Sequence, residues 1–117
     1  MFTPNPDRTF TKKVTFNVPS ESGAFQQFTL PVKFKALPKD QLRTLQEEAD
    51  DETAFERVVI GVEDVGDADG NKLEPAAAKA AMAQEPSFVY EATLTYYDAM
   101  LGGNLKAKTS ARRRGTG

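Results

Sequence analysis

Apolar and polar residues alternate in two stretches near the start of the chain. In residues 9–18 and 27–35 every second position carries Phe, Val or Leu, except at Lys12. Period-two alternation is typical of a half-buried strand. The turn-rich segment PSESGA joins the two stretches, so the pattern predicts an antiparallel hairpin. Pro31 lacks a backbone N–H, which predicts that the second strand is bent or lies at a sheet edge.

Helical patterns follow the hairpin, whose apolar face needs a second layer to cover it. Leu42 and Leu45 are three residues apart and predict a helix after Pro38. The alanine-rich segment 74–84 and the segment 86–103 predict two further helices, because each has a proline in its first turn. Two glycines close the last of them as stop signals.

The segment DETAFERVVIGVEDV, residues 51–65, admits two interpretations. Its apolar residues recur at i, i+3, i+4 and i+7, which favours a helix with Asp51 as its N-cap. These apolar residues are Phe55, Val58, Val59 and Val62. The β-branched run of residues 58–60 would instead suit a strand. We favour the helix, because the spacing outweighs a weak propensity.

The predicted fold class is therefore α+β. Residues 1–8 form a loose lead-in, and residues 9–103 form one domain, in which the N-terminal hairpin packs on about four α-helices. Residues 104–117 (NLKAKTSARRRGTG) form a basic tail that lacks the apolar residues needed to order it, so we expect disorder there.

The stretch VEDVGDADGNKLEP, residues 62–75, resembles a calcium loop at first sight. If Gly70 stands at the sixth position of an EF-hand loop, Val65 occupies the first and Ala76 the twelfth. Neither residue can supply the carboxylate required there. Asp, Asn and Gly are also the residues that favour tight turns. We therefore predict a turn between two elements and no metal site.

Composition excludes much chemistry. The 117 residues include no His, Cys or Trp. Disulfides, thiolate metal sites and the usual Ser-His or Cys-His pairs are thus impossible. We expect neither an enzyme nor a cofactor-binding protein. The sequence has no apolar run long enough for a membrane helix and no visible secretory signal, so we expect no membrane contact and residence in the cytoplasm.

Charge is divided between an acidic body and the basic tail. The tail carries five Lys or Arg and no acid, and the whole chain has a net charge of −2, so residues 1–103 carry −7. Residues 47–74 hold eleven acids against Arg57 and Lys72. The tail could remain solvated or contact an acidic surface, including that of a second copy. The acidic body and the absence of aromatics among the arginines argue against nucleic acid.

The last helix has two apolar stripes. The first is predicted to dock on the hairpin; it comprises Phe88, Val89, Ala92, Tyr96, Ala99 and Met100. The second comprises Tyr90, Leu94, Tyr97 and Leu101, and only Glu91, Thr95 and Asp98 remain clearly polar. The second stripe could pack on the alanine-rich helix, or it could be a surface for a partner or for self-association. Its four residues are our candidate partner-binding site.

The order of segments along this chain resembles that of a known protein family. An acidic helix that ends in an apolar run and Gly (FERVVIGVEDV) precedes an acidic turn (DADGN), a short helix and a final helix with Tyr near its end (EPSFVYEATLTYYDAMLGG). Over residues 38–108 this order resembles the tail assembly chaperones of long-tailed bacteriophages. Val62 stands where that family often has Trp, and the basic end is longer here.

The resemblance implies a non-structural helper protein in the host bacterial cytoplasm. Such a chaperone binds the tape-measure protein and keeps it soluble until tail-tube protein assembles around it. Two other functions remain open from the residues themselves. One is a minor structural subunit of the tail or connector, and the other is a nucleic-acid-associated regulator that uses the basic tail.

Overall fold

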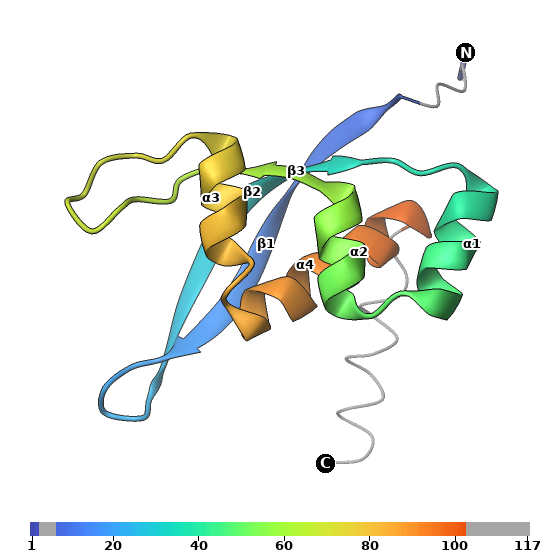
Figure 1. Ribbon diagram of the computed structural model, residues 1–117. Helices are drawn as coiled ribbons and strands as arrows, with labels where there is room; N and C mark the ends of the chain where they lie inside the picture. Colours follow the sequence, from blue (N-terminus) through green and yellow to red (C-terminus); the bar gives the residue numbers. More distant parts are fainter. Residues whose placement is uncertain (3–6, 103–117) are drawn as a thin grey trace.

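A computed structural model describes residues 1–2 and 7–102, which form an α+β fold of three strands and four helices (Figure 1). The predicted fold class is thus confirmed. The predictions for residues 103–117, including disorder of the basic tail, lie outside the described residues, as does part of the expected lead-in at residues 3–6.

The predicted hairpin is confirmed. Strand β1 (Thr9–Pro19) pairs antiparallel with β2 (Phe25–Lys35) along their whole lengths. A tight turn closes the hairpin, in which the Ser20 N–H donates to the Ala24 carbonyl over 2.7 Å. Gly23 has a φ of +87° in this turn, a conformation that glycine adopts without steric cost.

The predicted helix over residues 51–65 is wrong in its second half. Helix α2 (Asp51–Val58) ends where strand β3 (Val59–Val62) begins, and β3 pairs antiparallel with β2 in the order β1-β2-β3. Tertiary pairing decides the outcome, because β-branched residues fit a sheet that is already present beside them. The helical spacing holds only as far as Val58, and Val59 and Val62 are buried in the strand instead.

The N-cap of α2 also differs from the prediction by one residue. Asp50, not Asp51, caps the helix, since its Oδ1 accepts the Thr53 N–H over 2.8 Å. This hydrogen bond to a backbone N–H stabilises the charged carboxylate and lowers the pKa of Asp50 below 3.8.

Strand β2 lies between β1 and β3 in the sheet, although β3 pairs with it only beside residues 32–34, so the edge position predicted from Pro31 is wrong for that part of the strand. The Pro31 carbonyl accepts the Glu63 N–H over 2.9 Å, so the backbone groups of Pro31 face the β3 side of the strand. The missing N–H therefore removes no hydrogen bond between β1 and β2. Pro31 stands where pairing with β3 ends, because β3 pairs only with residues 32–34.

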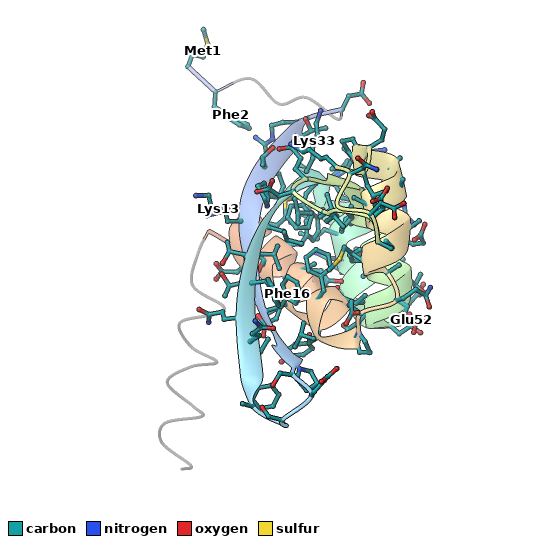
Figure 2. The ribbon with its side chains drawn as sticks, turned by 90° about the vertical axis from the view of Figure 1, so that its left-hand side faces the viewer. Met1, Phe2, Lys13, Phe16, Lys33 and Glu52 are labelled. Carbon is teal, nitrogen blue, oxygen red and sulfur yellow. The ribbon has the colours of Figure 1, made fainter. Side chains whose placement is uncertain are left out.

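Helices cover one face of this sheet. Besides α2 they are α3 (Pro75–Met82) on β3 and α4 (Pro86–Met100) on β1, whereas α1 (Lys39–Glu48) lies beyond α2, away from the sheet (Figure 1). Figure 2 shows Phe16 between the sheet and the helices, whereas Lys13 projects from the uncovered face. The fully buried large side chains come from both layers: Tyr96, Phe34, Phe55, Phe88, Val14, Val32, Val58 and Val62. No helix in the described part of the chain is long and apolar enough to cross a membrane.

The predicted turn at DADGN is confirmed. The Asp67 Oδ1 accepts the backbone N–H groups of Asp69 and Asn71, each over 2.9 Å. Gly70 has a φ of +83°, as its place in the turn requires. Asp67 thus uses its carboxylate to hold the loop in shape, as aspartates commonly do in turns.

Tyr96 ties the last helix to the segment after the hairpin. Its side chain is fully buried, and its hydroxyl accepts the buried Leu37 N–H over 3.1 Å. The ring also lies 5.5 Å from that of Phe34 and 6.0 Å from that of Phe10.

Replacing Tyr96 by Phe is expected to lower the free energy of unfolding by about 1–3 kcal/mol, because the Leu37 N–H then stays buried without its acceptor. Urea unfolding followed by circular dichroism measures the loss. Tyr97→Phe is the control and should cost less, since the half-buried Tyr97 hydroxyl makes no hydrogen bond to another described residue. Equal losses in the two variants would contradict the role given to the Leu37 bond.

Candidate partner-binding surface on the last helix

Helix α4 is fixed between β1 and α2. At its start, the Ser87 hydroxyl donates to the Asn17 carbonyl of β1 over 2.7 Å. Further along, the Thr93 hydroxyl lies 2.9 Å from the Val89 carbonyl and 3.4 Å from the Asp51 carbonyl of α2. These contacts determine which side of α4 faces the core.

The first predicted stripe of α4 does face the core. Phe88, Val89, Ala92 and Tyr96 are buried, and Met100 packs at the edge of the core. Phe88 lies edge-on to Phe16 of β1, with ring centroids 4.9 Å apart. The docking of this stripe on the hairpin is confirmed.

The second stripe, Tyr90, Leu94, Tyr97 and Leu101, lies beside the core-facing stripe, and we call it the outer stripe; its Tyr97 packs against the edge of the core. Tyr90 is 42% exposed and Leu101 is 46% exposed, while Leu94 and Tyr97 between them are half-buried. The stripe thus has two exposed apolar ends joined by a partly covered middle.

The alanine-rich helix α3 was one possible cover for the outer stripe. In the structure α3 packs mainly against β3, and α3 and α4 meet at the short turn between them. Lys79 of α3 faces α2, where its Nζ lies 3.6 Å from the Glu56 carboxylate and 2.9 Å from the Glu56 carbonyl. Helix α3 is therefore engaged elsewhere along most of its length.

The polar face of α4 is narrower in the structure than the sequence predicted. Thr95 is buried, with 5% of its surface exposed, whereas Glu91 and Asp98 are partly exposed. A threonine hydroxyl can bond to the carbonyl one helical turn earlier, as that of Thr93 does with Val89. Threonine is thus tolerated on a covered face, and counting it as a surface residue was the error.

Two tyrosines of this helix, Tyr96 and Tyr97, favour their neutral forms. Burial raises the pKa of Tyr96 above 10.0, and burial together with the nearby Asp51 charge raises that of Tyr97. The stability that depends on the neutral phenols is complete below pH 10 and is lost as the pH rises through the raised values. At neutral pH the half-buried Tyr97 keeps an apolar ring with an uncharged hydroxyl, which suits protein contact, while Tyr96 is fully buried.

A shallow pocket of about 290 Å³ adjoins the exposed end of the stripe at Tyr90. Ala83, Pro86 and Val89 give it apolar walls, and the acids Asp51 and Glu52 of α2 line it as well. Figure 2 places Glu52 on the helical side of the molecule. This pocket could not be predicted from the sequence, because its walls come from two stretches far apart in the chain, residues 51–52 and 83–90.

The described residues contain no group of three His, Cys, Asp or Glu side chains placed to hold a metal ion. Comparisons of this chain with protein families, curated proteins and solved structures found no match.

Proposed function

We propose that this protein is a tail assembly chaperone of a long-tailed bacteriophage, which binds apolar helical segments of the tape-measure protein through the outer stripe of α4. The observation that carries the binding role is the exposure of Tyr90 and Leu101 at the two ends of one apolar stripe. The choice of partner rests on the resemblance over residues 38–108.

The dimensions of the outer stripe suit a short helical ligand. Tyr90 and Leu101 are eleven residues apart, which corresponds to about 16 Å along the helix axis. A stripe of that length covers about three turns of a partner helix. Many weakly held copies could cover a long chain and be displaced one after another when tail-tube subunits assemble around it.

The charges beside the stripe favour a partner with basic residues next to its apolar ones. Asp51 and Glu52 line the pocket at Tyr90. Opposite charges across an interface increase the association rate and discriminate between partners, more than they add to affinity. A chaperone of this kind acts in the host bacterial cytoplasm, where tails assemble.

Changing Tyr90 and Leu101 together to Ser is expected to weaken partner binding by about 2 kcal/mol or more, the scale of an interface hot spot. Both side chains are exposed, so stability should change little. The test is co-expression with the tape-measure protein of the same phage, measuring how much of that protein stays soluble, beside a thermal melt of the variant.

The matched control is Ile60→Ser, which removes an apolar side chain that is 43% exposed on β3, away from the stripe. It should leave tape-measure solubility unchanged. Full solubility with the double variant would refute the assigned surface. A wild-type protein that leaves the tape-measure protein insoluble, or that remains in purified particles, would refute the chaperone function and favour a structural subunit.

A further inference from the structure

The half of β2 next to the hairpin turn, residues 25–30, has an open backbone edge. The Ala36 N–H bonds to the Arg8 carbonyl, and the Ser20 N–H bonds to the Ala24 carbonyl, so the hydrogen-bonded pairs between β1 and β2 fall on even-numbered residues. The N–H and C=O groups of odd-numbered residues therefore face the other side of β2. Strand β3 occupies that side only beside residues 32–34. Phe25, Gln27 and Thr29 consequently present their backbone groups to an edge with which no strand in the described part of the chain pairs.

This edge lacks the features that usually prevent further strand pairing. Residues 25–30 (FQQFTL) contain no charge and no proline, and the first proline is Pro31. Soluble proteins commonly protect an edge strand with lysines, prolines or bulges. Figure 1 shows the end of the hairpin extending past the helices, with β3 beside only the other part of β2.

A shallow apolar groove of about 260 Å³ lies beside the open edge. The hairpin contributes Phe16, Val18, Phe28 and Leu30 to it, and Val65 and Met82 form its other side. A strand added along β2 would direct every second side chain into this groove.

The groove has an acidic border. Asp64 and Glu85 line it directly. The loop that continues from Asp64 holds Asp67 and Asp69, and residues 63–72 contain four acids against Lys72 alone. Asp64 has a φ of 66°, and the chain turns away from β2 there, which leaves the edge uncovered. An incoming strand should therefore carry small apolar residues that alternate with basic ones.

We propose that this groove receives the C-terminal segment of a second copy of the chain, which adds to β2 as a further strand. Residues 105–112 read LKAKTSAR. Leu, Ala, Thr and Ala alternate there with Lys, Lys, Ser and Arg, and two more arginines follow. This segment matches the groove in its period of two and the acidic border in its charge.

The length of the chain assigns the segment to another copy. The groove lies at the start of α4, since Glu85 lines it and Ser87 bonds to Asn17 of β1. Helix α4 then extends about 22 Å away, at 1.5 Å per residue. From Met100 to Leu105 an extended chain reaches at most about 17 Å. Leu105 therefore cannot reach the groove of its own molecule, and a strand that begins at Leu105 must come from another copy, so the association is head-to-tail and open-ended.

The test measures the size of the full-length protein by sedimentation velocity over a range of concentrations at low salt. The edge variant is Gln27→Pro, and its control is Gln27→Ala. The Gln27 N–H faces the open edge, and Pro31 already occupies an equivalent position, so the hairpin keeps its hydrogen bonds. The tail variant reverses three charges through Lys106→Glu, Lys108→Glu and Arg112→Glu.

Wild type and Gln27→Ala should grow in average mass with concentration, while the edge and tail variants each stay monomeric. In an equimolar mixture of those two variants, the edge variant still has a wild-type tail, and the tail variant still has a wild-type β2 edge to receive it. The mixture should form a dimer and nothing larger.

Monomeric wild type at the highest concentration, or association of the edge and tail variants like that of wild type, would overturn the proposal. A mixture that stays monomeric would overturn it too.

If a thermal melt shows that Gln27→Pro is unfolded, Asp64→Lys combined with Glu85→Lys replaces it, because these exposed or half-exposed acids lie outside β2. Failure here leaves the α4 proposal intact, since tape-measure solubility is measured separately.

Discussion

Replacing Phe88 by Ala is expected to lower the free energy of unfolding by about 3–5 kcal/mol. Phe88 is fully buried, and its ring lies edge-on to Phe16 of β1 at 4.9 Å and to Phe55 of α2 at 5.9 Å. The side chain thus joins the sheet, α2 and α4 at one point. A domain of this size has a total stability of about 5–15 kcal/mol, so the variant should be close to unfolding at room temperature.

The matched control for Phe88 is Phe28→Ala. Phe28 is also a phenylalanine beside Phe16, at 5.8 Å, but it is 43% exposed. Its removal leaves little cavity, so the loss should be less than half as large. Urea unfolding followed by circular dichroism compares the two variants. Similar losses would show that Phe88 does not hold the two layers together as described.

The hairpin could be predicted from the sequence because its two strands have a period of two over their whole lengths. Only one face of the sheet is covered, so each apolar position has a polar neighbour facing solvent. Lys12 breaks the pattern and is exposed. The last two helices could be predicted equally well, since prolines and glycines mark their boundaries.

Strand β3 could not be predicted, because four residues carry too little periodicity to distinguish a strand from a helix. The pairing of Val62 with Val32 and of Val59 with Phe34 decides its structure, and both partners lie in the hairpin. The same long-range information was missing for Pro31. A proline marks where a ladder can lose a donor, but not which strands lie on either side.

The outer stripe could be found from spacing alone, but its exposure could not. A helical projection places Tyr90, Leu94, Tyr97 and Leu101 on one side of α4 without showing what lies opposite. The structure separates the exposed ends from the half-buried middle, and so it changes which residues a binding test should alter. The open edge of β2 could not be predicted from the sequence either, because it exists only where the short strand β3 ends.

A glycine in β3 sets how closely α3 approaches the sheet. A Cβ added at Gly61 would lie 2.7 Å from the Cβ of Pro75, and 3.5 Å from its carbonyl carbon and oxygen. The neighbour is a rigid ring at the first position of α3 and cannot rotate away as the end of a flexible side chain could. Any side chain at residue 61 must therefore displace the start of α3 from β3.

Replacing Gly61 by Ala is accordingly expected to lower the free energy of unfolding by about 1–3 kcal/mol, despite the usual preference for Ala over Gly in a strand. Gly66→Ala is the control; its added Cβ would lie 3.7 Å from the nearest atom, an ordinary contact, so its effect should be small. Pro75→Gly removes the opposing Cβ. Combined with Gly61→Ala it should lose less stability than the two changes summed, because the clash is then absent. Additive losses in urea unfolding would mean that the contact between Gly61 and Pro75 does not limit the approach of α3.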